Sequence, residues 1–214
     1  MSPRAGLTRD RIVDASLELL RAQPDRPLTM RLLATHLGVD PMALYRHVRD
    51  KRELVAALSD RALSDGLRAG FDRGSRSATA HGFAAAIGRS LYEHLVRHPE
   101  LIPIVATAPT TMTSARYGVE VVARLVSGGV DERTAIIGVN AVVAFALGSA
   151  LLSLEPATPL APIDADELSA TLSTGGSPVE VATVQRLLAT IDTNDFDAGL
   201  AALLTGLLGR DSAA

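Results

Sequence analysis

The chain has 214 residues, of which 47% are hydrophobic, and it contains no cysteine. This length and apolar content predict one large or two smaller packed domains rather than a disordered chain. The lack of cysteine excludes disulfides, thiolate zinc sites and cysteine nucleophiles. Together with an N-terminus that lacks a signal-peptide pattern, it favours a cytoplasmic protein.

The charge is distributed unevenly along the chain. Residues 1–76 contain 14 Lys and Arg against 10 Asp and Glu, whereas residues 77–214 contain 7 against 14. A basic first part on an acidic remainder predicts that the first part meets a polyanion and the remainder does not. Chance asymmetry is the alternative, and charge alone does not exclude it.

The first 60 residues contain four helix-start signals. Thr8, Thr29 and Asp40 are typical N-caps, each flanked by the apolar pair that fixes the entry of the chain. Asp50 with Glu53 has the spacing of a capping box. We therefore predict one helix from each cap. The first runs from 8 to before 24 and the second covers 29–37. The third begins at 41, and the fourth runs from 51 to about 67.

The second and third of these helices form a predicted helix-turn-helix. Gly38 ends the second helix, and only about two residues separate it from the third. In such a unit the second helix enters the major groove of DNA. Leu44 and Val48 are four residues apart and are expected to face the core. The tip, the outer face and the next helix start then carry Pro41, Met42, Ala43, Tyr45, Arg46, His47 and Lys51.

The segment LTMRLLATHLGVDPMALYRHVRDKRELVAAL, residues 28–58, resembles the DNA-binding domain of the tetracycline repressor (TetR) family of bacterial transcription regulators. The resemblance covers residues 8–58. It implies that Thr29 and Arg31 contact the DNA backbone, with Arg31 able to reach a base. It also implies that Pro41, Met42 and Ala43 lie against bases and that Tyr45, His47 and Lys51 hold phosphates. Arg46 stands where an aromatic residue is common in close relatives of the founding repressor, so we expect a further phosphate contact there.

Each of these residues also has a plainer interpretation. Tyr45 could cover the edge of the core, His47 could be an ordinary surface histidine, and Lys51 could be a solvated helix start. Met42 could pack inward. Arg49, Arg52 and His36 are expected on the solvent side.

Beyond residue 60 the pattern predicts only helices. A loop is expected over 72–82, and the three prolines of 98–111 leave room only for short helical turns. The expected helices are 83–98, 112–126, 131–154, a short turn behind Asp164, 179–191 and 196–208. The fold class is therefore all-α: an N-terminal three-helix helix-turn-helix DNA-binding domain over 1–58, and a larger helical ligand-binding and dimerisation domain over 59–214. The apolar stretch 135–154 has the length of a membrane span, but its polar and small residues favour a buried interface helix.

Two of these helices carry small and apolar residues at spacings of three and four, which is typical of helices that pack closely. The TetR family dimerises through its last two long helices, so the resemblance implies a four-helix interface between two copies. Plain intramolecular core is the alternative. The candidate interface residues are Gly138, Ala141, Phe145, Gly148, Leu152, Leu200, Leu203, Leu204 and Leu207.

The resemblance also implies a ligand pocket in the second domain. His94 and Arg116 stand out because a polar group needs a reason to face inward, while plain core is an equally good interpretation of most others. The candidates are Phe83, Ile87, Leu91, His94, Ile104, Met112, Arg116, Tyr117, Val121 and Phe145.

No metal or cofactor is expected. The spacing of His94 and His98 suits a metal site, but no third ligand is evident. The founding repressor's magnesium–tetracycline histidines have no counterpart, with Leu67 near the position of the first. The chain contains only 3% aromatic residues. A medium-sized, mainly aliphatic ligand is therefore expected, rather than tetracycline or a stacked aromatic drug.

The leading functional prediction is a ligand-responsive transcriptional regulator, a repressor that binds a palindromic operator as a homodimer and is released by a small molecule. One alternative is an all-α small-molecule carrier or enzyme that retains a vestigial DNA-binding head. The sequence lacks a glycine-rich phosphate loop, a GxSxG serine, a metal cluster and a convincing carboxylate pair, so no catalytic residue is predicted. An architectural DNA binder without ligand control is the third possibility.

Overall fold

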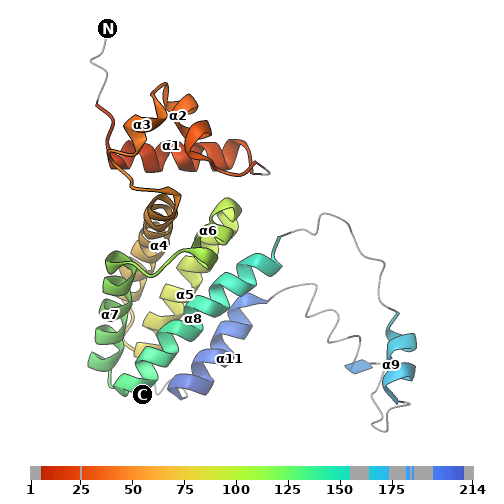
Figure 1. Ribbon diagram of the computed structural model, residues 1–214. Helices are drawn as coiled ribbons and strands as arrows, with labels where there is room; N and C mark the ends of the chain where they lie inside the picture. The colour runs from red at the N-terminus through yellow and green to blue at the C-terminus, as the bar shows by residue number, and fades with distance from the viewer. Residues whose placement is uncertain are drawn as a thin grey trace.

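The computed structural model describes residues 6–24, 26–154, 164–173, 182–183, 185 and 195–209, and every regular element in these ranges is a helix (Figure 1). This confirms the expected all-α class. The elements are α1 (Arg9–Ala22), α2 (Met30–Leu37), α3 (Pro41–Leu44), α4 (Lys51–Gly74), α5 (Ala80–Arg97), η1 (Pro99–Leu101), α6 (Ile102–Thr107), α7 (Met112–Ser127), α8 (Glu132–Leu152), α9 (Ala165–Ser173) and α11 (Phe196–Leu208).

The predicted N-caps begin the first three helices. The Thr8 hydroxyl accepts a hydrogen bond from the backbone of Arg11, and the Thr29 hydroxyl accepts one from that of Leu32, at 3.2 and 3.1 Å. The Asp40 carboxylate accepts from the backbone of Met42 at 2.8 Å. Each bond satisfies an N–H that the helix itself leaves unpaired.

The helices α1 to α3 and the start of α4 form the head, whose apolar core is part of one cluster that continues into the body. Ile12, Leu33, Leu44 and Leu54 are fully buried in it. The turn between α2 and α3 depends on Gly38, whose φ of 67° and ψ of 35° lie in the left-handed region that favours glycine. These apolar anchors fix the position of α3 on the surface of the head.

The expected boundaries of α4 and α5 were wrong. α4 continues to Gly74 rather than ending near 67, and α5 begins at Ala80, so the connection is much shorter than the predicted loop over 72–82. The reason is the close packing of the two helices. A Cβ at Gly74 would lie 2.5 Å from a ring carbon of Phe83, and one at Gly70 would lie 3.0 Å from the Cα of Ile87. These glycines serve helix packing, although they look like helix breakers in the sequence.

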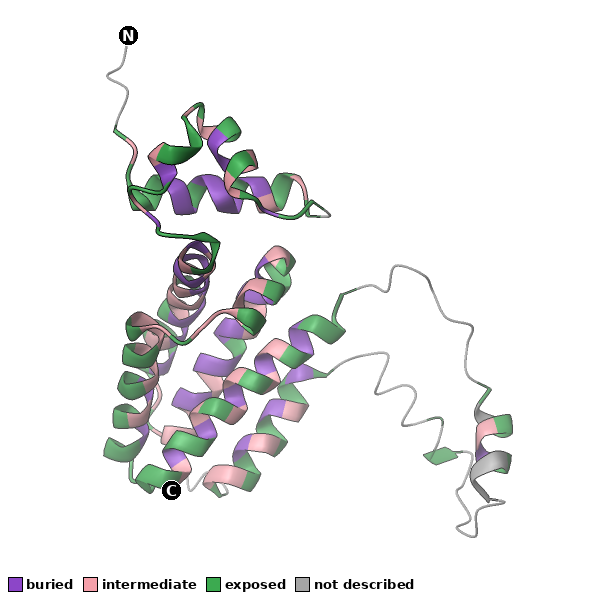
Figure 2. Ribbon diagram, viewed as in Figure 1, coloured by how far each residue is buried: buried purple, intermediate pink, exposed green. Residues whose placement is uncertain are grey.

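The body is a bundle in which α4 packs on α5, α5 on α8, and α8 on α7 and α11 (Figure 1). Buried residues follow the inner faces of these helices, and exposed residues follow the outer faces (Figure 2). α4 runs from the head into the body, so it crosses the predicted domain boundary at residue 58. α4 is therefore shared by the head and the body.

The remaining predictions for the body are mixed. The proline-rich segment holds only the short η1 and α6, as expected. The short helix behind Asp164 is α9, whose first turn is capped by that carboxylate at 2.8 Å from the backbone of Asp166. The predicted helix 179–191 lies outside the described residues, apart from 182–183 and 185.

α8 is long and apolar enough to cross a membrane by length and composition, and 33% of its apolar window is buried in the subunit. One such helix among the described residues is weak evidence of a membrane span, because a core helix of a soluble protein passes the same test. It packs on α5, α7 and α11, so one face of the helix lies in the core of the subunit.

Candidate functional site

The tip of α3 is the most exposed apolar point of the head. Met42 is 68% exposed and Pro41 is also exposed, while Ala43 is half-buried. Leu44 and Val48 lie beneath them, both almost fully buried. The tip is therefore held rigidly by the core but remains free to contact another molecule.

The regular part of α3 is shorter than predicted. The helix ends at Leu44, and Tyr45, Arg46 and His47 follow in a turn instead of continuing the helix. The backbone N–H groups of His47 and Val48 both donate to the carbonyl of Leu44, at 2.9 and 3.0 Å. Tyr45 and Arg46 are exposed and His47 is half-buried.

Several cations near this tip have no acidic partner. Arg31, Arg46 and Lys51 are exposed, and none of them forms an ion pair with a described residue. Thr29 is exposed as well, at the start of α2. An unpaired surface cation can neutralise a phosphate without first losing a partner in the protein. Of the predicted DNA contacts, Thr29, Arg31, Pro41, Met42, Tyr45, Arg46 and Lys51 are exposed, whereas Ala43 and His47 are half-buried.

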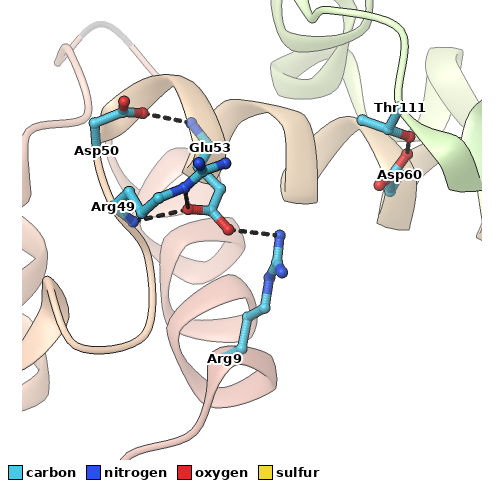
Figure 3. Close-up of polar contacts among 6 residues, drawn as sticks. All are labelled: Arg9, Arg49, Asp50, Glu53, Asp60 and Thr111. Atoms are coloured by element: carbon cyan, nitrogen blue, oxygen red, sulfur yellow. Dashed lines mark hydrogen bonds and ion pairs between the residues drawn. The ribbon is translucent and has the colours of Figure 1, made fainter.

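Arg49 is different, because it is held by Glu53 (Figure 3). The Glu53 carboxylate accepts from the backbone N–H of Arg49 at 2.8 Å and from its guanidinium at 3.1 Å, and it also pairs with Arg9 at 3.4 Å. The bond from the Arg49 backbone holds the pKa of Glu53 below its ordinary value. Glu53 thereby joins α1, the α3–α4 connection and α4.

The expected capping box at the start of α4 is only partly formed. The Asp50 carboxylate accepts from the backbone of Glu53 at 2.8 Å, as predicted (Figure 3). In a complete box the Glu53 carboxylate would return to the N–H of Asp50. It bonds the N–H of Arg49 instead. Arg49 is therefore a structural residue of the head.

The body contains a cavity of about 330 Å³ between α4, α5, α7 and α8. Its wall includes Ser59 and Leu63 of α4, Ile87 of α5 and Tyr117 of α7, and Asn140 of α8. The segment 108–110 between α6 and α7 also lines it. The cavity is in direct contact with α4, the helix that carries the head.

Three of the predicted pocket residues, Ile87, Tyr117 and Val121, line this cavity. Phe83 and Leu91 are buried in the hydrophobic core instead, and Ile104 packs against that core. A sequence pattern separates core from cavity wall poorly, because both demand apolar side chains on the inner face of a helix.

Four other candidates lie away from the cavity. Met112 is 87% exposed at the first turn of α7, and Arg116 is exposed with its guanidinium carbon 5.7 Å from the centre of the Tyr117 ring. Phe145 stacks on Phe196 of α11, with ring centres 5.3 Å apart. His94, the fourth candidate, is buried on α5.

His94 is buried on α5, and its ring centre lies 4.9 Å from that of His98. Its Nε2 atom has no hydrogen-bond partner in the structure. Burial lowers the pKa of His94, and the neighbouring His98 lowers it further. Among the described residues no group of three or more His, Cys, Asp and Glu could hold a metal ion, so these two histidines have no third ligand there.

Sequence reasoning missed the contribution of α4 to the cavity. Ser59 is 5% exposed, and it interrupts a helix face that is otherwise occupied by residues such as Leu63. A buried polar side chain on an apolar face is the signal that could have identified it. Asn140 is one of the polar residues in the apolar stretch 135–154, and the sequence does not indicate that it lines a cavity.

Two contacts connect the body to the head or to its supporting helix. Thr111, the N-cap of α7, donates its hydroxyl hydrogen to the carboxylate of Asp60 on α4 (Figure 3). Arg21, in the last turn of α1, donates to the carboxylate of Glu100 in η1 at 3.0 Å. The first contact lies at the rim of the cavity, because Ser59, Thr110 and Ser114 all line it.

The predicted dimer residues do not all face outward. Leu200 and Leu204 are 2% and 1% exposed within one subunit, and Gly138 is buried too. Ala141, Leu203 and Leu207 are half-buried, as is Phe145. Only Gly148 and Leu152 are exposed. These buried side chains are occupied by packing between α5, α8 and α11, so they are not free for a second copy.

A neighbouring face of the same two helices is exposed instead. On α8 it carries Ile137, Asn140, Ala144, Gly148 and Leu151 at spacings of three and four. On α11 it carries small residues at spacings of four, namely Ala198, Ala202 and Gly206. We call these eight residues the α8–α11 face. Small residues at this spacing let two helices approach closely.

Comparisons with known proteins cover both parts of the chain. The family described as "Bacterial regulatory proteins, tetR family" matches residues 12–58, and "Tetracyclin repressor-like, C-terminal domain" matches residues 78–210. The HTH-type transcriptional repressor DrrR1 of Streptomyces coeruleorubidus is 33% identical over 126 residues, which are 58% of this chain and 45% of that protein. Tetracycline repressor protein class D of Escherichia coli is 46% identical over 55 residues, which are 26% of this chain and 25% of the repressor. The chain thus spans less than half the length of either relative.

Solved structures match over nearly the whole chain. Apo ActR of Streptomyces coelicolor has a TM-score of 0.72 at 26% identity, over 99% of this chain and 100% of that one. ActR in complex with actinorhodin has a TM-score of 0.68 at 26% identity, over 95% and 98%. The head and the helical body therefore occur together, in this order, in other proteins.

Proposed function

Since the chain belongs to the tetR family of bacterial regulatory proteins, we propose that it is a ligand-responsive transcriptional regulator that binds operator DNA as a homodimer. The observation that carries the proposal is a head that exposes both an apolar tip and cations without acidic partners. Met42 is exposed at the tip of α3, and Arg31, Arg46 and Lys51 are exposed without acidic partners among the described residues. A DNA-binding surface needs side chains that contact the bases and cations that contact the phosphates.

In this proposal the tip reads base edges and the surrounding groups hold the backbone. Pro41, Met42 and Ala43 lie against bases, and Arg31 reaches the backbone or a base. The other backbone contacts come from Thr29, Tyr45, Arg46, His47 and Lys51. Phosphate contacts fix the register of the head, and base contacts supply its specificity.

The homodimer forms through the α8–α11 face. Its support is an exposed set of small and aliphatic residues on two adjacent helices, including Ala144 and Ile137 of α8 and Ala202 of α11. A two-fold pair of heads reads two half-sites separated by about one turn of DNA or a multiple of it. The operator is therefore expected to be palindromic.

The cavity of the body receives the small-molecule effector. Its walls include α4, so an occupant that favours one position of α4 also favours one spacing of the two heads. ActR, which shares the fold, has been solved with actinorhodin bound. Because the relative DrrR1 is a repressor, we propose that effector binding releases DNA and relieves repression.

This protein acts as a regulator in the cytoplasm and not as an enzyme. The support is the assignment to a family of bacterial regulatory proteins. A repressor needs no catalytic residue, because it functions by binding DNA and effector with affinities that depend on each other.

The experiment uses an operator duplex enriched from a random pool by the wild-type protein. Tyr45→Ala combined with His47→Ala is expected to weaken operator binding at least about tenfold, since each lost contact to a charged group is worth about 1.5–3 kcal/mol. Sedimentation should show an unchanged dimer. Arg68→Ala is the control, because Arg68 is exposed on α4 but lies outside the proposed DNA contacts. Unchanged operator affinity in the double variant would disprove the assignment of the DNA-binding surface.

A further inference from the structure

The wall of the cavity contains no charged side chain among the described residues. Its lining is mainly aliphatic, with hydroxyl groups from Ser59, Thr110, Ser114 and Tyr117 and the amide of Asn140 as polar groups. The sequence had suggested His94 and Arg116 as its polar contacts. Neither lines the cavity.

Asp60 and Arg116 adjoin wall residues in the chain, and each has another contact. Asp60 is adjacent to Ser59 in the chain and accepts the hydrogen bond from Thr111. Arg116 is exposed, with its guanidinium over the ring of Tyr117. A ligand carboxylate or ammonium in this cavity would therefore lose water without gaining an opposite charge. Burying an ion without such a partner is strongly unfavourable.

The polar groups of the wall differ in what they can offer. Ser114 is committed to the start of α7, where its hydroxyl donates to the carbonyl of Thr111 at 3.0 Å. Asn140 donates to the carbonyl of Ile136 at 3.0 Å. The Ser59 hydroxyl forms no hydrogen bond with another described residue, although the residue is 5% exposed. The hydroxyls of Thr110 and Tyr117 form no hydrogen bond with a described residue either, but Thr110 is exposed and Tyr117 is half-buried. Because Ser59 is the buried one of these three residues, and buried hydroxyls normally have a partner, it is the polar group that gains most from a ligand.

We propose that the occupant of this cavity is an uncharged, mainly aliphatic molecule with a hydroxyl or carbonyl oxygen that hydrogen-bonds Ser59. The volume of about 330 Å³ lies at the small end of the range for ligand pockets. Calling this molecule the effector rests on the proposed function, whereas its binding chemistry rests on the cavity alone.

Calorimetric titration of the full-length protein at neutral pH tests the proposal with three probes that share one alkyl chain: decanol, decanoate and decylammonium. Decanol is expected to bind at least about tenfold more tightly than either ion. Equal or tighter binding of decanoate or decylammonium would overturn the proposal. So would a failure of decanol to bind.

Ser59→Ala tests the hydrogen bond. It should weaken decanol binding about two- to tenfold, the range that one hydrogen bond supplies. Ser64→Ala is the matched control, because Ser64 is on the same helix, donates to the carbonyl of Asp60 at 2.6 Å and does not line the cavity. Equal effects of the two substitutions would exclude a specific role of Ser59.

The failure of this proposal is distinguishable from the failure of the proposed function. If decanol binds as expected but no operator is bound, the protein is a carrier of neutral molecules and the regulatory function is wrong. If an operator is bound but is released only by an ionic compound, the proposed regulatory function is correct and the proposed ligand class is wrong.

Discussion

Thr111 and Asp60 connect the wall of the cavity to the helix that carries the head. The Thr111 hydroxyl accepts a hydrogen bond from the backbone of Ser114 at 3.0 Å, which caps α7, and donates to the carboxylate of Asp60 on α4. Residues on both sides of the contact line the cavity. A ligand that displaces the start of α7 must therefore stretch or break this bond to α4.

Asp60→Ala should uncouple the two sites. The substitution removes the bond to α4 but leaves the Thr111 cap in place, so we expect a loss of about 0.5–1.5 kcal/mol in the free energy of unfolding. The ratio of operator affinities with and without saturating ligand should move towards one, while ligand affinity itself changes little. Anisotropy titrations of labelled operator measure this ratio. Thr111→Ser keeps the hydroxyl and is expected to behave as wild type; an unchanged ratio in Asp60→Ala would remove Asp60 from the coupling.

Ala202→Arg should abolish the dimer without unfolding the subunit. Ala202 is exposed on α11 within the α8–α11 face, so the arginine can extend into solvent in one subunit but places an unpaired charge in the contact between two. Sedimentation should give monomers, with a circular dichroism spectrum like that of wild type, and operator affinity should fall at least about tenfold. Ala123→Arg, exposed on α7, is the control. A dimeric Ala202→Arg would place the interface elsewhere.

Gly118→Leu should fill the cavity. Gly118 lines it, and a Cβ at this position meets no other atom within 4 Å. Because glycine is a poor helix residue, the substitution should raise the stability of α7 by roughly 0.5–1 kcal/mol while it blocks decanol binding. Gly118→Ala adds only a methyl group and is expected to keep most of the binding. Thermal unfolding with and without decanol separates the two effects, and undiminished binding in Gly118→Leu would mean that the probe binds elsewhere.

The buried His94 should make the protein less stable in mild acid. Burial holds the pKa of His94 below its ordinary value of 6.5, so the unfolded chain binds this proton more readily than the folded protein. Stability is therefore complete above pH 6.5 and decreases as the pH falls from 6.5 towards the folded pKa. Asp65, Arg97, His98 and Glu100 also act on this ring. Melting temperatures between neutral and mildly acidic pH should decline less steeply in His94→Gln, and parallel curves would contradict this reason.

The head was largely predictable from the sequence, because its signals are local. Thr8, Thr29 and Asp40 each cap a helix within three residues of themselves, and Gly38 ends α2 by its own backbone conformation. Such signals act over a few residues and do not require knowledge of the rest of the fold. These local signals did not indicate that α3 ends at Leu44, before Tyr45, Arg46 and His47.

The body was less predictable, because its contacts join distant segments. Gly70 and Gly74 resemble a helix end but allow α4 to pack on α5, and Leu200 looks like an interface residue but fills the core of its own subunit. Whether an apolar side chain meets core, cavity or partner depends on which helices surround it. Ser59 interrupts an apolar helix face, which marks it in the sequence, but only the arrangement of the neighbouring helices places it in the cavity wall.

A salt titration of operator binding tests the central claim most directly. If Arg31, Arg46 and Lys51 of both subunits each hold a phosphate, the logarithm of the binding constant should fall linearly with the logarithm of salt concentration, with a slope of about −5. Lys51→Ala should reduce the magnitude of that slope by about two, because it removes one contact from each half of the dimer. The duplex enriched from a random pool should also contain two symmetric half-sites. Binding without sequence preference, and with a slope that Lys51→Ala leaves unchanged, would contradict the account.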